Sequence, residues 1–203
     1  MTKVAEESVL RTATRGQRAG KYLTFQIENE EFGILVIRIR EIMGIQQITA
    51  VPHTPSHVKG VINLRGKVIP IIDLRIKLGL DRRVYDQRTC IIVAQVRCGE
   101  SLVLMGIVVD AVSEVVTLTE EQIEDPPKFG GGVQVRYLLG MAKTSGKVKM
   151  LLDIDEALSA EDLKELRQLM EQLLEQQSPS PDCQRNDAVT HEDKSQHGTT
   201  QAL

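Results

Sequence analysis

Two histidines and one glycine–lysine motif are the residues whose spacing could support chemistry. His53 and His57 stand four residues apart, a spacing that would align two metal ligands on a helix. Pro52 and Pro55 break such a helix, and no carboxylate or cysteine lies nearby to complete a ligand set. We therefore expect two loop imidazoles and no metal site.

The glycine–lysine motif also fails as a phosphate-binding loop. Five residues separate Gly140 from Gly146-Lys147 where the loop requires four, and Val148 replaces the hydroxyl residue that binds magnesium. Asp73 and Asp110 end apolar strands, where aspartate commonly caps a turn. None of the paired carboxylates stands beside a nucleophile or base. The sequence thus predicts neither an enzyme nor a bound cofactor.

Composition excludes several other classes of protein. The 203 residues carry a net charge of −3, with 3% aromatic residues and no Trp, so neither electrostatic capture nor base stacking of nucleic acid is expected. Three cysteines without a CxxC pair fit a reducing compartment. The longest apolar stretches have eight residues, whereas a spanning helix needs about 20. We expect a cytoplasmic protein with no membrane insertion.

The chain divides into a polar arm, a β-rich middle and a polar end. Residues 1–20 are predicted to be a flexible arm, and residues 178–203 a disordered tail beginning Ser178-Pro179-Ser180-Pro181. Three polar segments, 65–67, 97–100 and 143–147, read as hairpin tips, and Pro70 predicts an edge or a bulge. Many short strands with polar turns indicate one or two small barrels. The expected strands are 22–27, 61–64, 68–74, 89–96, 101–109, 112–118, 133–141 and 148–154.

Helices are fewer. Thr119 begins a capping-box pattern with Gln122, and the prolines after Asp125 would end that short helix. An apolar stripe predicts an amphipathic C-terminal helix over residues 159–177. Residues 35–43 fit either a strand, by alternation, or one face of a helix.

Two surface features suit recognition of a partner. Arg65 stands at a tight glycine-containing tip, where side chains project outward, although a solubilising turn arginine would look the same. The arginines of the run 37–41 could equally form a solvated face.

Four ordered blocks of residues resemble the CheW family. The most characteristic is Gly60-Val61-Ile62-Asn63-Leu64-Arg65-Gly66 followed by Val68-Ile69-Pro70-Ile71-Ile72-Asp73-Leu74-Arg75. The others are Glu31-Phe32-Gly33-Ile34 leading to Arg40-Glu41-Ile42, then Gly106-Ile107-Val108-Val109-Asp110 with Val112-Ser113-Glu114-Val115, then Tyr137-Leu138-Leu139-Gly140. The likeness spans residues 21–158.

The resemblance implies a mainly β fold of two SH3-like five-stranded β-barrels packed together, with short helices, one of them over residues 35–42. It implies a non-enzymatic adaptor that couples the cytoplasmic tip of chemoreceptors to the regulatory domain of the histidine kinase CheA. Members assemble with both partners into arrays, where weak self-association is expected. A paralogue serving a gliding or surface-sensing pathway, a small-barrel nucleic-acid binder and an enzyme are the alternatives.

The resemblance also assigns protein-binding residues by motif position. Ile39 and Glu41 fall where the family contacts kinase or receptor, and Gly60 and Arg65 fall at positions implicated in coupling. Apolar partner surfaces are expected at Val68, Val112 and Val115. Apolar contact would supply affinity, and the few charges would set specificity.

Overall fold

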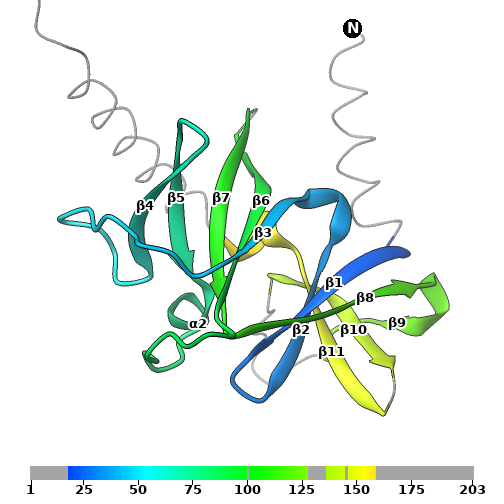
Figure 1. Ribbon diagram of the computed structural model, residues 1–203. Helices are drawn as coiled ribbons and strands as arrows, with labels where there is room; N and C mark the ends of the chain where they lie inside the picture. The colour runs from blue at the N-terminus through cyan, green and yellow to red at the C-terminus, as the bar shows by residue number, and fades with distance from the viewer. Residues whose placement is uncertain (1–17, 100, 128–135, 145, 159–203) are drawn as a thin grey trace, which may run out of the picture.

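The computed structural model describes residues 18–99, 101–127, 136–144 and 146–158. Within these ranges the chain forms two β-sheets, each curled into a barrel, and Figure 1 shows the two barrels side by side. The first sheet has the strand order β8-β1-β2-β11-β10-β9, and the second has the order β3-β6-β7-β5-β4. The predicted mainly β fold of two barrels is therefore confirmed, with β9 as a sixth, very short strand in the first.

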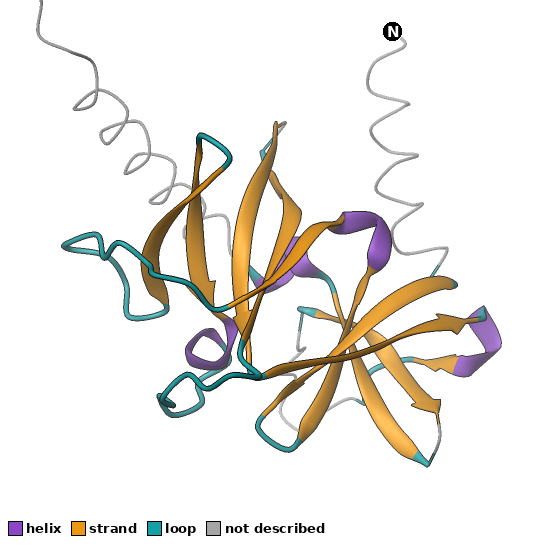
Figure 2. Cartoon of the chain, in the orientation of Figure 1, coloured by secondary structure: helices purple, strands orange, loops and turns teal. Residues whose placement is uncertain are grey.

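The chain begins in the first barrel, builds the whole second barrel and then returns to the first. The first barrel contains β1 (Gly20–Ile27), β2 (Glu30–Leu35), β8 (Ala111–Leu118), β9 (Ile123–Glu124), β10 (Leu138–Thr144) and β11 (Lys147–Leu152). The second contains β3 (Ile39–Gly44), β4 (Val58–Leu64), β5 (Lys67–Asp73), β6 (Cys90–Cys98) and β7 (Ser101–Val109). Single helical turns follow β2, β5, β8 and β11, and Figure 2 draws them in purple; they are η1 (Val36–Arg38), α2 (Leu74–Lys77), η2 (Glu120–Gln122) and α3 (Ile154–Ala157).

The three predicted hairpins are present. In the β4–β5 hairpin Leu64 pairs with Lys67, which leaves Arg65 and Gly66 as a two-residue loop. Both loop residues have positive φ, 53° and 83°, as a type I′ turn requires. The other two tips are also shorter than predicted, because Cys98 pairs with Ser101 and Thr144 with Lys147. Pro70 lies one residue before β5 begins to pair with β7, so it does not interrupt that pairing.

The two barrels repeat one local frame. The segment β4–β5–α2 and the segment β10–β11–α3, 80 residues later, share three features. The first strand has a bulge near a glycine, the sequence Gly-Lys-Val follows the hairpin tip, and an aspartate caps the helical turn at the end. Asp73 accepts hydrogen bonds from the N–H groups of Arg75 and Ile76, and Asp153 accepts one from the N–H of Asp155. The capping role predicted for Asp73 is thereby confirmed.

Among the described residues, three apolar clusters form the core. One lies inside each barrel, and the largest lies between the barrels and draws buried side chains from both sheets. β6 serves two of them, since Ile91 and Val93 face the interior of the second barrel while Ile92 and Ala94 join the shared core. Burial on both faces explains why β6 begins with an unbroken apolar run, residues 90–94, rather than an alternating one.

Two helix predictions need correction. The helix expected over residues 35–42 is wrong beyond Arg38: after the single turn η1 the chain becomes strand β3, because its backbone pairs with β6. The helix beginning after Thr119 has both reciprocal bonds of the capping box, but it ends at Gln122 rather than near Asp125. It stops there because Ile123 is buried and pairs with Ala142 of β10.

Several predicted segments fall wholly or partly outside the described residues. These are most of the arm, the amphipathic helix over 159–177, the tail over 178–203 and the first residues of the strand expected over 133–141. The end of the arm is described: Gly20 already belongs to β1, and Arg18 forms ion pairs with Glu120 and Asp125. Within the described ranges, no helix is long and apolar enough to cross a membrane.

Candidate functional site

Arg65 projects from the tip of the β4–β5 hairpin. Its side chain is 80% exposed, and its Nη2 donates a 3.0 Å hydrogen bond to Oε1 of Glu41 on β3. The hairpin tip is fixed from within as well, because the side chain of Asn63 accepts a 2.8 Å hydrogen bond from the N–H of Gly66. Arg65 is therefore an exposed guanidinium on a rigid turn, with one donor engaged and the remainder open to solvent.

The Arg65–Glu41 pair joins the two ends of the second sheet. β3 and β4 are the first and last strands in that sheet's order. Thr49, which follows β3, exchanges two backbone hydrogen bonds of 2.9 Å with Val61 of β4. The ion pair therefore lies where the barrel closes. It brings Arg65 and Glu41, which the sequence indicated only by motif position, into direct contact.

Gly60 belongs to this closure rather than to an exposed surface. It is buried, its φ is 134°, and a Cβ at this position would stand 2.0 Å from the carbonyl oxygen of Thr49. Only glycine allows the two backbones to approach so closely. The structure thus supplies a structural reason for glycine here that does not require partner contact.

The remaining residues predicted on this barrel are half-buried. Ile39 packs against the shared core, and Val68 lies opposite Asn63 in the hairpin. Sequence reasoning missed two more exposed apolar side chains in the same segment, Ile37 of η1 at 80% exposure and Ile42 of β3 at 44%. The signal was available for Ile42, because alternation along β3 places it on the outward face. We call Ile39, Glu41, Arg65 and Val68 the Arg65 surface.

Val112 and Val115 lie on β8 of the first barrel, so the predicted binding residues fall on two barrels. Val115 is 55% exposed, whereas Val112 is half-buried and packs against the shared core. We call these two valines the β8 surface. The two surfaces therefore belong to different barrels.

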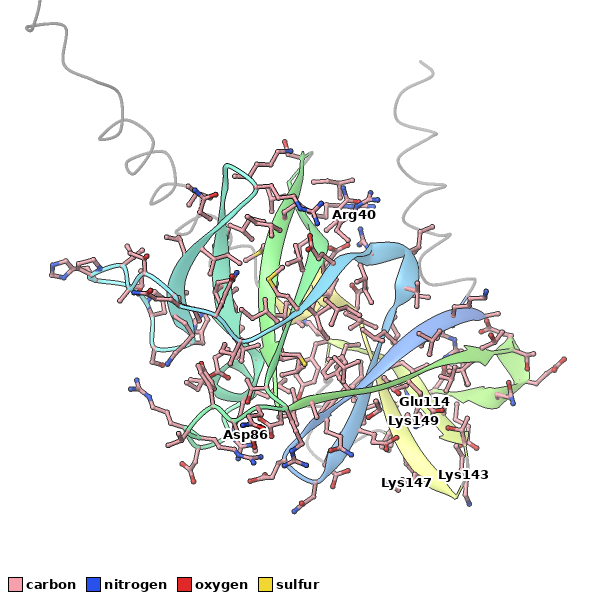
Figure 3. All side chains as sticks on the ribbon, in the orientation of Figure 1. Arg40, Asp86, Glu114, Lys143, Lys147 and Lys149 are labelled. Atoms are coloured by element: carbon pink, nitrogen blue, oxygen red, sulfur yellow. The ribbon has the colours of Figure 1, made fainter. Side chains whose placement is uncertain are left out.

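A buried lysine lies beside the β8 surface. Lys149 of β11 is 3% exposed and pairs with Glu31 of β2, while Glu114 of β8 stands 3.6 Å from its Nζ (Figure 3). The hydrogen bond from Lys149 lowers the pKa of the Glu31 carboxyl below its ordinary value, against the opposing effect of burial. These charges link three strands of the first barrel and hold β8 in place.

The two histidines lie in the loop before β4. His53 is exposed with a φ of 60°, and His57 is half-buried. Among the described residues, no group of three or more His, Cys, Asp and Glu side chains is arranged to hold a metal ion.

Comparison with known proteins gives consistent matches. Residues 21–162 match the model of the CheW-like domain. The chemotaxis protein CheW of Klebsiella aerogenes is 40% identical over 163 residues, covering 80% of this chain and 94% of that protein. The crystal structure of the scaffolding protein TtCheW from Thermoanaerobacter tengcongensis is similar with a TM-score of 0.63 and 30% identity, covering 71% of this chain and 95% of that one. A more distant match, protein FrzA of Myxococcus xanthus, is 26% identical and covers 66% of this chain and 81% of that protein.

Proposed function

We propose that this chain, which belongs to the CheW-like domain family, is a non-enzymatic cytoplasmic adaptor that couples chemoreceptors to the histidine kinase CheA. The relatives named chemotaxis protein CheW and the neighbour titled a scaffolding protein support this role. The partners we propose are the cytoplasmic tip of the receptor and the regulatory domain of the kinase, with weak self-association in membrane-associated arrays.

The observation that carries the proposal is the exposed, ion-paired Arg65. A guanidinium is a planar fork of five donors that suits a carboxylate or a row of carbonyl groups on a partner. Glu41 engages one donor and holds the fork in one place, which reduces the entropy lost when a partner binds. Exposed Ile42 on the neighbouring strand adds apolar area, as an interface core requires.

Two surfaces on two barrels suit an adaptor. We assign the Arg65 surface to one contact and the β8 surface to a second, so that receptor and kinase bind one chain simultaneously. An enzyme would instead need a nucleotide or acid–base site, and the sequence offers neither motif. We therefore expect calorimetry to detect no stoichiometric binding of ATP.

The test is binding of the chain to a receptor cytoplasmic fragment and to the kinase regulatory domain, first separately and then together. Arg65→Glu should weaken at least one complex by roughly 30-fold, the equivalent of about 2 kcal/mol for a central interface arginine. Arg65→Lys should recover only part of the affinity, because an ammonium group cannot reproduce the fork. Arg88→Glu is the matched control, since Arg88 is 68% exposed on a different loop.

Unchanged affinity and unchanged kinase control in Arg65→Glu would leave Arg65 as a turn residue and remove the proposed site. A second candidate function is a paralogous adaptor for a non-chemotactic receptor pathway, which the likeness to FrzA favours. Repeating the binding series with receptor fragments from both kinds of pathway would distinguish the two.

A further inference from the structure

We propose that Arg75 is a positioning residue that fixes the angle between the two barrels. This inference deepens the proposed function, because a fixed angle would hold the Arg65 surface and the β8 surface in one relative orientation. The geometry of the barrels does not depend on the identity of the partners.

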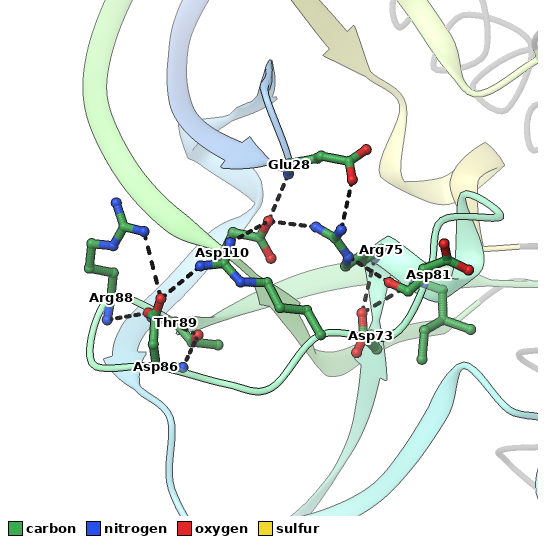
Figure 4. A network of polar contacts seen from close by, with 10 residues as sticks. Glu28, Asp73, Arg75, Asp81, Asp86, Arg88, Thr89 and Asp110 are labelled. Atoms are coloured by element: carbon green, nitrogen blue, oxygen red, sulfur yellow. Dashed lines mark hydrogen bonds and ion pairs between the residues drawn. The ribbon is translucent and has the colours of Figure 1, made fainter.

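Arg75 links side chains from both barrels, as Figure 4 shows. It stands on α2, directly after β5 of the second barrel. Its Nη2 lies 3.0 Å from Oε1 of Glu28, in the β1–β2 turn of the first barrel, and its Nη1 lies 2.8 Å from Oδ2 of Asp110. Its Nε donates to the carbonyl oxygen of Asp81 at 2.6 Å. The guanidinium thus bridges the barrels with all three of its nitrogens engaged.

Asp110 occupies one of the two places where the described chain passes between the barrels; the other is η1, between β2 and β3. β7 of the second barrel ends at Val109, and β8 of the first begins at Ala111. The carboxylate of this single connecting residue also accepts a 2.7 Å hydrogen bond from the N–H of Glu28. A rotation of one barrel against the other would strain the chain at this crossing, where Arg75 holds Asp110 to Glu28.

Glu28 itself is held in a conformation that ordinary residues avoid. Its φ is 61°, which is uncommon for a residue other than glycine. Its N–H is bound by Asp110 and its carboxylate by Arg75, so two contacts fix the turn. Strained backbone persists where the surroundings over-determine it. The turn is therefore built as a rigid point of attachment for the other barrel.

The repeat described above places a second clamp at the equivalent position of the other barrel. Asp155 on α3 lies 80 residues after Arg75 and likewise two residues after a capping aspartate. It pairs with Arg38 of η1 and accepts a 2.7 Å hydrogen bond from the N–H of Arg97, on β6 of the second barrel. Arg97 lies near the tip of the β6–β7 hairpin, whereas Asp110 follows the hairpin's other end.

The two clamps therefore stand at opposite ends of the hairpin that packs into the shared core. Apolar burial between the barrels is non-directional and tolerates small rotations. Charge-assisted hydrogen bonds are directional, so they select one angle among those that the core permits. Removing Arg75 should leave the barrels folded and joined, with one end of their interface released.

The direct test measures the distance between spin labels on the two barrels, by pulsed electron resonance on the full chain. Labelled cysteines replace exposed Lys67 on β5 and exposed Lys143 on β10, in a background whose three native cysteines are changed to serine. Arg75→Met should broaden or shift the distance distribution, and Arg75→Lys should do so less. Arg88→Met, which removes an arginine from the neighbouring loop, should leave the distribution unchanged.

A second variant keeps the inference falsifiable if Arg75→Met fails to fold. Glu28→Gly removes the partner carboxylate while allowing the positive φ, so it should fold and should also broaden the distribution. An unchanged distribution in Glu28→Gly and in any folded Arg75 variant would overturn the inference.

The functional consequence is measured separately. Arg75→Met should bind the receptor fragment and the kinase regulatory domain singly with wild-type affinity, yet lose receptor control of the kinase in the ternary complex. A purely stabilising role for Arg75 predicts full receptor control in the folded variant, and that result would overturn the positioning role. If the wild-type chain binds neither partner, the proposed function fails, while the label distances still decide the geometry.

Discussion

Replacing Gly60 by alanine is the sharpest test of the closure of the second barrel. Gly60 has a φ of 134°, and the added Cβ would lie 2.0 Å from the carbonyl oxygen of Thr49 and 2.7 Å from its carbonyl carbon. Both are backbone atoms, so no side-chain rotation can relieve the contact. The loop that contains Thr49 would have to move away from β4.

The expected loss of stability can be estimated from two contributions. Forcing a residue other than glycine into this backbone region costs about 1–3 kcal/mol. Moving Thr49 would break its two 2.9 Å hydrogen bonds with Val61, and a backbone hydrogen bond contributes roughly 0.5–1.5 kcal/mol. Together these give about 2–6 kcal/mol, a large part of the stability of about 5–15 kcal/mol that is usual for a native protein.

Urea unfolding of Gly60→Ala, compared with two control variants, measures this cost. Gly66 also has positive φ but nothing lies within 4 Å of its added Cβ, so Gly66→Ala should lose only about 1–2 kcal/mol. Gly44 has neither positive φ nor a close neighbour, and Gly44→Ala should lie within about 0.5 kcal/mol of wild type. A midpoint for Gly60→Ala as high as that for Gly66→Ala would refute the close-approach argument.

The result bears on how Gly60 variants are to be interpreted. If Gly60→Ala displaces Thr49, the neighbouring contact between Arg65 and Glu41 would also be disturbed. Loss of coupling in such a variant would then arise from a distorted barrel and would not locate a partner at Gly60.

Three further predictions follow from charges and from the sequence. The hydrogen bond from Lys149 lowers the pKa of Glu31 in the folded protein, so this pair stabilises the fold above pH 4.5, and the stabilisation is lost as the pH falls below that value. Glu31→Gln should therefore make the urea midpoint fall less steeply with decreasing pH. A slope identical to that of the wild type would contradict this prediction. Burial raises the pKa of Tyr22 from 10.0 to about 12, so stability should fall as pH rises through that interval, and Tyr22→Phe, followed by alkaline unfolding, should reduce the fall. Truncation after Gln177 should leave the melting temperature unchanged, because the removed residues are almost all polar; a clear decrease would mean that they pack on the barrels.

The hairpins were predictable from the sequence because each one has a local signal. The loop Arg65-Gly66 between two apolar strands specifies a tight turn, and the Thr119 capping box specifies where a helical turn begins but not that it ends at Gln122. The segment over residues 35–42 was assigned a helix from the resemblance, although its own alternation was the better guide beyond Arg38. Pairing with β6 determines the conformation of that segment beyond Arg38, and the sequence near the segment does not identify this partner strand.

The polar links between the barrels could not be predicted. Arg75 is 35 residues from Asp110 and 47 from Glu28, and no spacing rule connects residues so far apart. The sequence indicated Asp73 and Asp110 as turn caps, and Asp73 does cap α2. For Asp110 the capped turn lies in the other barrel, which only the folded structure reveals.

The repeated frame separates what maintains the barrels from what distinguishes them. Positions that match after 80 residues, such as the glycines in the bulged arms and the capping aspartates, serve the same structural purpose in both copies. Equivalent positions whose residues differ between the two barrels do not serve this shared structural purpose. Arg65 of the second barrel corresponds in sequence, 80 residues later, to Ser145, and two residues after the capping aspartates the barrels have Arg75 and Asp155. Arg65 is exposed, so its side chain is suited to binding a partner. Arg75 is buried, so its side chain is suited to holding the barrels together.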